Sequence, residues 1–326
     1  MTLKLSVSPK EWPLHKPFKI SREVHTHSET IICEISDGIH TGRGEATGVS
    51  YDGETIESIQ KQVEGIAGQV EAGLTRDELQ SLLPAGGARN GIDCALWDLE
   101  AKQSGQTIWQ MLGWSPRPVT TVYTVGIDNA ANMEKDAQEH NDHAIIKVKV
   151  GIGDPLEQIA AINAGAPGAA IVIDANQAWT VADLKRYTEP LKAMGVEMIE
   201  QPMSMTEDEA LRGYQSPLPL CADESCATSA DLERLQGLYS MVNIKLDKTG
   251  GLTEALKLAA QAESMGFELM VGNMLGSSLA MAPSFVIAQR CRYVDIDGPL
   301  LQAEDCDNAM HYEHGIVAVF TPKLWG

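Results

Sequence analysis

The sequence has few basic residues for its size. Its 326 residues include 25 lysines and arginines against 45 aspartates and glutamates, which gives a formal net charge of −20. A chain this acidic repels the phosphates of nucleic acids and the anionic surface of membranes, so we expect neither as a partner. The length is enough for one large domain or two ordinary ones with a buried core.

The cysteines and the N-terminus lack the signs of a secreted protein. The six cysteines are scattered without a Cys-x-x-Cys pair, so neither a disulfide framework nor a zinc site is expected. No apolar run with a small-residue cleavage site opens the sequence, so no signal peptide is predicted. The long charge-free stretch, residues 269–289, is broken by glycines, polar residues and Pro283, which predicts a buried strand, loop and helix rather than a membrane span. These absences predict a cytoplasmic protein.

Two patterns divide the chain. In residues 1 to about 115, the stretch TIICEISDGIHTGRGEA contains two alternating strands around Asp37-Gly38, a typical hairpin signal. Helical periodicity follows over residues 54–71, 75–83 and 88–102. Strands that precede helices in this way predict an α+β domain.

From residue 119 the sequence alternates between strands and helices. We predict eight strands, in VTTVYTVGI, AIIKVKVG, AAIVIDANQ, EMIEQP, LPLCADES, MVNIKLDK, FELMVGN and RYVDIDG. Helical stretches such as residues 154–164, 181–194 and 253–265 separate nearly all of them. This repeat predicts an α/β fold of the (β/α)8 TIM-barrel type. A doubly wound sheet is the alternative, but no GxGxxG follows the first strand, and GRGEATG has the wrong spacing.

Three parts are therefore expected. Residues 1–115 form the α+β capping domain, residues 116–300 form the barrel, and residues 301–326 form a short segment that packs back on the capping domain.

Acidic residues stand at the ends of three successive predicted strands. Asp174 lies in VIDAN, Glu200 in MIEQP and Asp223 in CADES. One acidic residue there could be a helix N-cap, but a barrel gathers its strand ends at one mouth, where three carboxylates repel one another. A divalent cation relieves this repulsion, and ligands that are all oxygen favour Mg²⁺, with Mn²⁺ as an alternative, over zinc. The trio therefore predicts a site for one Mg²⁺ ion per chain.

Two lysines share one face of an otherwise apolar strand, IIKVKVG. Lys147 and Lys149 point the same way because strand side chains alternate between faces. Lys245 lies on the sixth predicted strand, which stands opposite the second in an eight-stranded barrel. We expect Lys149 and Lys245 to face each other across the mouth, on either side of the carboxylates.

Such lysines suit proton transfer. A lone lysine at a strand end is commonly a surface side chain, but a buried lysine near cations loses its proton more easily and is a competent general base. A metal beside a substrate carboxylate would stabilise the dianion that forms when the α-proton leaves.

The segments KVKV, DANQAW, EQP, ADES and NIKLDKTGG, in this order, resemble the enolase superfamily, muconate-lactonizing subgroup. The resemblance covers nearly the whole chain and implies a capping domain on a modified, (β/α)7β barrel. It implies that Asp174, Glu200 and Asp223 bind magnesium. It also implies that Lys149 and Lys245 are the acid/base catalysts, one removing an α-proton and the other returning one to the opposite face.

Other residues are implied to bind substrate. Lys147 is expected to contact the substrate carboxylate. Thr124 and Met274, the latter through its backbone, are expected to line the pocket.

Within this subgroup the chain looks most like the dipeptide epimerases, in particular those acting on L-Ala-D/L-Glu. The segment VDIDGP places Asp295 and Asp297 on one face of the last strand. The resemblance implies that this pair binds the free ammonium of a dipeptide, and two carboxylates would indeed attract a cation and repel an acyl group. An ordinary acidic turn is the alternative.

The capping domain is implied to select the substrate side chain through two loops, near residues 18–27 and 48–54. Arg22 is the candidate for the distal carboxylate of a glutamyl residue, because a guanidinium binds a carboxylate in bidentate fashion. A surface arginine is equally compatible with the pattern. The neighbouring His25 and His27 match no family position.

Lys248 and Glu224 lie next to the proposed catalyst and metal ligand, and each could be mistaken for it. Lys248 follows Lys245 by three positions, so on a strand it points to the other face, and Lys245 is preferred as the catalyst. Glu224 follows Asp223 directly, so alternation is expected to turn it away and to leave it a supporting role behind the ligands.

The sequence thus predicts an isomerase, a Mg²⁺-dependent epimerase that inverts the α-carbon of the C-terminal residue of a small dipeptide, with a role in recycling cell-wall peptides. The same site also suits a muconate-type cycloisomerase, an o-succinylbenzoate synthase or an N-acylamino-acid racemase. A barrel that only binds a ligand or metal is a third alternative, although the three carboxylates and two opposed lysines argue against it. Homo-oligomer formation is left open.

Overall fold

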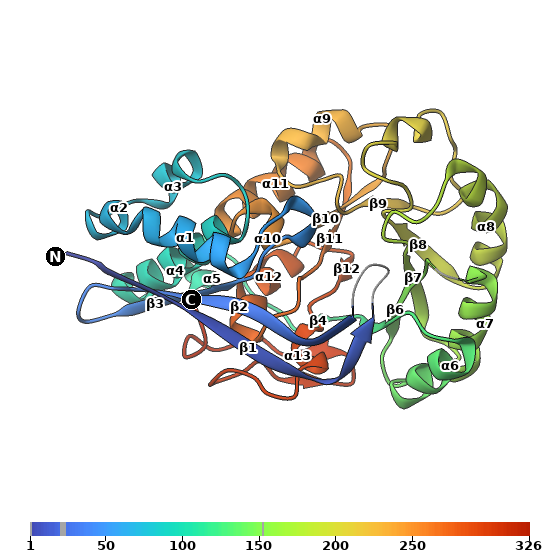
Figure 1. The fold of residues 1–326 in the computed structure, drawn as a ribbon, viewed down its shortest axis with the longest axis horizontal. Helices are drawn as coiled ribbons and strands as arrows, with labels where there is room; N and C mark the ends of the chain where they lie inside the picture. The colour runs from blue at the N-terminus through green and yellow to red at the C-terminus, as the bar shows by residue number, and fades with distance from the viewer. Residues whose placement is uncertain (1, 20–23, 152) are drawn as a thin grey trace.

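The computed structural model describes residues 2–19, 24–151 and 153–326. Two parts are visible in Figure 1: an antiparallel sheet with helices against it, and a parallel sheet that curls around its own axis with helices outside. This arrangement confirms the predicted α/β barrel with an α+β cap.

The capping sheet has three strands. β1 (Lys4–Lys19) pairs antiparallel with β2 (Val24–Ser36), which pairs antiparallel with β3 (Thr41–Ala46). Period-two alternation sends Ile31, Cys33 and Ile35 to one face, where all three are fully buried. Helix α4 (Gly87–Ser104) lies against this face. The approach is so close that a Cβ on Gly44 would stand 2.2 Å from Gly91 O, which explains the glycine.

The remaining helices of the cap are short. They are η1 (Ser50–Asp52), α1 (Ile56–Gly65), α2 (Ala67–Glu71), α3 (Arg76–Leu82) and α5 (Ile108–Leu112). The single helix predicted over residues 54–71 is therefore wrong in extent. It breaks at Ile66, whose ψ of 10° is not helical, and the glycines on either side, Gly65 and Gly68, weaken the helix there.

Eight parallel strands form the barrel, each hydrogen-bonded to the next in chain order. They are β5 (Tyr123–Val125), β6 (Ile145–Lys149), β7 (Ala170–Asp174), β8 (Val196–Glu200), β9 (Leu220–Ala222), β10 (Met241–Ile244), β11 (Glu268–Val271) and β12 (Tyr293–Val294). The Val122 N–H donates to Val294 O at 2.8 Å, which brings the first and eighth strands together.

Helices follow these strands, and all but α13 lie between two of them along the chain. They are α6 (Ala130–Glu139), α7 (Pro155–Gly165), α8 (Val181–Ala193), η2 (Asp208–Leu211), η3 (Ser229–Asp231), α9 (Leu232–Leu235), α10 (Leu246–Thr249), α11 (Leu252–Ser264), α12 (Ser278–Ala288) and α13 (Gly298–Leu301). None of the helices in the described parts of the chain combines the length and apolar character that a membrane span needs.

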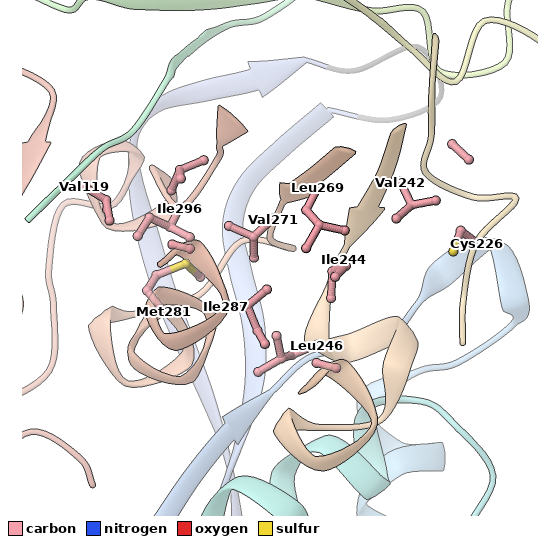
Figure 2. Close-up of a cluster of buried hydrophobic side chains, with 14 of the residues drawn as sticks. Val119, Cys226, Val242, Ile244, Leu246, Leu269, Val271, Met281, Ile287 and Ile296 are labelled. Atoms are coloured by element: carbon pink, nitrogen blue, oxygen red, sulfur yellow. The ribbon is translucent and has the colours of Figure 1, made fainter. Parts of the chain in front are cut away.

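The main core lies between the strands and these helices. Figure 2 shows Val242 and Ile244 of β10, Leu269 and Val271 of β11, and Ile287 of α12 in one buried cluster. Because these strand residues face outward to the helices, the residues between them face into the barrel. This alternation positions the site described below.

The first predicted barrel strand is divided. Residues Val119–Thr120 form β4, which pairs with β14 (Ile316–Val317) and, through it, with β13 (Tyr312–Glu313). The C-terminal residues also contact the cap, since the Trp325 Nε1–H donates to Cys94 O at 3.0 Å and the Gly326 N–H to Asp98 Oδ1 at 2.8 Å. The domain boundaries given above stay predictions.

Candidate active site

The inward-facing residues of the barrel form two layers. In the lower layer, Val172, Met198 and Met241 pack together and are fully buried. Two positions later each strand faces inward again, nearer its carboxyl end. In β7 and β8 these positions hold Asp174 and Glu200, both 0% exposed. A polar layer therefore lies directly on an apolar plug.

Lys147 joins three carboxylates within this polar layer. Its Nζ lies 2.7 Å from Asp295 Oδ2, 2.7 Å from Glu200 Oε2 and 3.3 Å from Asp174 Oδ2. Burial alone would lower the pKa of Lys147, but the attraction of these three carboxylates raises the pKa well above its usual value. Lys147 is thus a fixed positive charge at the centre of the site.

Lys149 and Lys245 each pair with a different carboxylate. Lys149 Nζ lies 2.7 Å from Asp174 Oδ2, and Lys245 Nζ lies 2.7 Å from Asp223 Oδ2. Lys149 ends β6 and Lys245 follows β10, and β7, β8 and β9 stand between these two strands. The structure therefore brings the predicted lysines and carboxylates together at one mouth of the barrel.

The pKa of Lys245 moves against the expected direction. Burial would lower the pKa of this lysine, but the carboxylates of Asp223 and Glu200 outweigh burial and raise it. A lysine poised to lose its proton therefore requires a cation that offsets these carboxylates, because the carboxylates alone have the opposite effect.

The expectation that Lys248 points away is wrong. β10 ends at Ile244, and Lys245 is the N-cap of the short helix α10, so Lys248 lies about one helical turn later on the same side. Lys248 Nζ stands 2.6 Å from Asp223 Oδ1 and also donates to the Asp223 and Asn243 carbonyls. Burial opposes ionisation of Asp223, but Lys245 and Lys248 together hold its pKa well below the usual range.

The expectation that Glu224 turns away is also wrong. β9 ends at Ala222, so strand alternation no longer applies at Asp223 and Glu224, and both line the same cavity. The Gln177 Nε2–H donates to Glu224 Oε1 at 2.9 Å. Burial, with the charges of Asp223 and Asp174, raises the pKa of Glu224.

Asp295 and Asp297 stand at the opposite side of the polar layer. Asp295 forms an ion pair with Lys147, and Asp297 Oδ2 accepts a hydrogen bond from the backbone N–H of Thr124 at 2.8 Å. Burial and the neighbouring charge of Asp295 raise the pKa of Asp297 to about 7. Thr124 therefore reaches the site through its backbone.

Three amide side chains that the sequence reasoning missed hold the charged groups. The Asn243 Nδ2–H donates to Glu200 Oε1 at 2.7 Å, and the Asn273 Nδ2–H donates to Asp295 O at 2.7 Å. Gln201 Oε1 accepts the Asp223 N–H at 2.9 Å. Only Asn243 had a sequence signal, because it precedes Lys245 by two positions on the same strand face.

A cavity of about 610 Å³ opens above these groups. The barrel contributes Thr124, Lys147, Lys149, Asn176, Asp223, Glu224, Lys245, Asn273, Met274, Leu275, Asp295, Asp297 and Leu301. The cap closes it with residues of both predicted loops, among them His25, His27 and Tyr51. The two histidines thus have a place in the cavity wall, and Arg22 lies outside the described residues.

The carboxylates suit a hard divalent cation by donor type. Asp174, Glu200 and Asp223 are buried and supply only oxygen. Glu200 Oε2 accepts no hydrogen bond, although Lys147 Nζ lies 2.7 Å away. Within the described ranges no three His, Cys, Asp or Glu side chains already converge as metal ligands. Asp174 and Asp223 form ion pairs with lysines instead, and a bound cation would replace some of these ion pairs.

Two family models together match most of the chain. Residues 2–113 match the N-terminal domain of mandelate racemase and muconate lactonizing enzyme, and residues 129–323 match the enolase C-terminal domain-like family. The chain belongs to the enolase superfamily. The family matches confirm the resemblance that the sequence motifs predicted.

Curated relatives of this enolase-superfamily chain include epimerases and a racemase. The L-Ala-D/L-Glu epimerase of Escherichia coli (strain K12) is 40% identical over 314 residues, covering 95% of this chain and 98% of the relative. The N-acetyl-D-glutamate racemase of a Pseudoalteromonas species is 42% identical over 300 residues, covering 91% and 95%.

Solved structures of the superfamily share the fold over nearly the whole chain. An enolase family member from Agrobacterium tumefaciens with homology to dipeptide epimerases, with bound sodium and L-Ala-L-Glu, has a TM-score of 0.97 and 42% identity, covering 99% of this chain and 100% of its own. The dipeptide epimerase of Enterococcus faecalis V583, complexed with Mg and L-Leu-L-Tyr, has a TM-score of 0.91 and 26% identity, covering 98% and 97%.

Proposed function

We propose that this chain is a Mg²⁺-dependent dipeptide epimerase that inverts the α-carbon of the C-terminal residue, with L-Ala-Glu as the preferred type of substrate. One observation carries the proposal. Lys149 and Lys245 approach one mouth from opposite strands, each 2.7 Å from a different buried carboxylate. The epimerase relatives of Escherichia coli and Enterococcus faecalis support the same reaction class.

The two lysines carry the proton transfer in this proposal. A substrate α-carbon held between them presents its hydrogen to one Nζ and its opposite face to the other. Removal by one lysine and return by the other inverts the centre.

The carboxylates of Asp174, Glu200 and Asp223 would hold the metal. When bound, Mg²⁺ supplies positive charge beside the substrate carboxylate and so favours loss of the α-proton. Lys147 adds a second fixed positive charge, since its three carboxylate contacts keep it protonated. Release of Asp174 and Asp223 to a cation would also free Lys149 and Lys245 for substrate.

Substrate selection is assigned to three groups of residues. Asp295 and Asp297 would bind the free ammonium, with Thr124 fixing Asp297 through its N–H. Met274 lies in the cavity wall. Arg22 remains the candidate for a distal carboxylate. Recycling of murein peptides in the cytoplasm is the role such an activity would serve.

Proton exchange in heavy water tests the proposal. Wild-type protein incubated with L-Ala-L-Glu and MgCl2 in D2O is expected to lose the glutamyl α-proton signal in NMR while the D-Glu epimer appears. Lys149→Ala is expected to abolish exchange from one epimer and Lys245→Ala from the other, because each lysine serves one face. No exchange with any member of a dipeptide library would refute the epimerase.

A second candidate is racemisation of N-acylated amino acids. It is favoured by the N-acetyl-D-glutamate racemase relative, whose substrate name contains no free ammonium. It also agrees with a protonated Asp297, which could donate to an acyl carbonyl. Asp297→Asn separates the two: loss of dipeptide turnover with retained N-acetylglutamate turnover favours an ammonium site, whereas no effect on any dipeptide contradicts it.

A further inference from the structure

Glu45 is a buried carboxylate at the junction of the cap and the barrel. It lies near the end of β3 and is 1% exposed. The Trp12 Nε1–H donates to Glu45 Oε1 at 2.9 Å from the cap. From the barrel, the Ser277 N–H donates to Oε1 at 3.1 Å and the Ser277 hydroxyl to Oε2. No lysine, arginine or histidine among the described residues forms an ion pair with it.

These contacts place Glu45 on the positive end of a barrel helix. Ser277 is the N-cap of α12, an 11-residue helix whose first N–H groups attract a negative charge. Burial raises the pKa of Glu45, while the hydrogen bonds of Ser277, Thr30 and Trp12 oppose this rise. A buried carboxyl group without hydrogen-bond partners is costly, so these donors determine the position of the Glu45 side chain closely.

The segment that ends at Ser277 forms one wall of the catalytic cavity. Residues 272–277 connect β11 to α12, and Asn273, Met274 and Leu275 line the cavity. The Asn273 Nδ2–H donates to Asp295 O at 2.7 Å and to Asp295 Oδ1 at 3.2 Å. A chain of contacts therefore runs from Trp12 and Glu45 to Ser277, along the segment to Asn273, and to Asp295.

We propose that Glu45 is a positioning residue through which the cap fixes residues 272–277 and thereby holds Asp295 in place for the substrate ammonium. The last step rests on the proposed function, whereas the anchoring of the segment does not. Loss of the anchor is expected to weaken substrate binding and to leave proton transfer nearly intact, because Lys149 and Lys245 pair with Asp174 and Asp223 and not with Glu45, Ser277 or Asp295.

Glu45→Gln tests the anchor with little change of shape, since an amide presents its own N–H groups to donors. Asp93→Asn is the matched control. Asp93 is another buried cap carboxylate that accepts an N–H from the first turn of a barrel helix, Thr253 N at 2.9 Å, but that helix is α11 and not α12, the helix into which residues 272–277 lead.

Hydrogen exchange measured by mass spectrometry is the first readout. In Glu45→Gln, residues 272–277 and 293–297 are expected to exchange about tenfold faster than in wild type, because their anchor opens more often. Asp93→Asn is expected to leave both segments unchanged. Unaltered exchange of either segment in Glu45→Gln would overturn the proposal, whether or not the protein is an epimerase.

Steady-state kinetics is the second readout. KM for L-Ala-L-Glu is expected to rise about tenfold in Glu45→Gln with kcat within about threefold of wild type, the pattern of lost binding without lost chemistry. An equal KM in variant and wild type would overturn the link to Asp295. A wild-type protein without dipeptide turnover would refute the proposed function, and hydrogen exchange would still decide the anchor.

Ser277→Ala provides a milder variant in case Glu45→Gln does not fold. It removes one of the two Ser277 donors and keeps the backbone N–H. The same segments are expected to exchange faster, by a smaller factor, and the double variant is expected to be less impaired than the sum of the two single ones. Additive effects would contradict a direct coupling between Glu45 and Ser277.

Discussion

The pKa of each carboxyl group in this site depends on its immediate neighbours. Asp174 and Glu200 are both fully buried, yet Lys149 and Lys147 lower the pKa of Asp174 to about 2 against the effect of burial, whereas burial and the charge of Asp174 raise the pKa of Glu200 to about 7. Two carboxylates on adjacent strands therefore differ in their affinity for a proton because they differ in their lysine partners.

Asp223→Asn is expected to destabilise the protein strongly. It leaves the buried ammonium groups of Lys245 and Lys248 without their carboxylate, which costs roughly 3–5 kcal/mol for a broken buried pair. Urea unfolding in EDTA measures the loss. The control is Glu209→Gln, because its pair with Arg212 is exposed to solvent and contributes little to stability. Similar losses in both variants would contradict the assignment.

The ionisation of Asp297 predicts a pH dependence of substrate binding. Its pKa is raised to about 7, so the side chain is neutral below and negative above this pH, and only the anion attracts an ammonium. KM for L-Ala-L-Glu is therefore expected to rise as the pH falls from 8 to 6, and Asp297→Asn is expected to remove this rise. A KM that is flat over this range in the wild type would contradict the ammonium site.

Strand ends decide which side chains reach the cavity. β9 and β10 stop one residue before Asp223 and Lys245, so the chain can turn Glu224 into the cavity wall and Lys248 onto the Asp223 carboxylate. β11 likewise stops at Val271, one residue before Gly272, whose backbone passes close to Lys245. The irregular segments after the strands thus carry as much of the site as the strands do.

Gly272→Ala is expected to disturb this packing. A Cβ there would stand 2.7 Å from Asn243 Nδ2 and 2.9 Å from Lys245 Cε, so side chains must shift, at a cost of roughly 1–3 kcal/mol. We expect at least a severalfold fall in kcat, measured by proton exchange at saturating dipeptide. Gly68→Ala in α2 is the control: its Cβ meets nothing within 4 Å, and it should raise stability by at most ~1 kcal/mol without altering kcat. Full activity of Gly272→Ala would contradict the close contact.

At the scale of the whole molecule, the cap and the barrel together form the cavity. The barrel supplies the charged mouth, and the cap supplies further residues of the cavity wall; Figure 1 shows the adjoining ends of β1 and β2 near the barrel. Neither part alone contains the complete cavity.

Magnesium is expected to stabilise the whole fold. A ligand that binds only the native state adds about 2.7 kcal/mol at one hundred times its Kd, so the thermal midpoint should rise with Mg²⁺ concentration. Glu200→Gln should lose most of this rise, because the amide brings no charge to the ion. An equal rise in Glu200→Gln, measured by circular dichroism, would place the bound ion elsewhere.

The sequence by itself determined the strand order and the inward face of each strand, because alternation and the βα repeat are local properties. It therefore placed Asp174, Glu200, Lys147 and Lys149 correctly on one face, and its motifs were sufficient for the superfamily. The positions of Lys248 and Glu224 escaped it, because they depend on where a strand stops. Only the tertiary structure decided those ends, the amides that hold the charges and the junction at Glu45, because these arise from contacts between residues far apart in the chain, which no local pattern records.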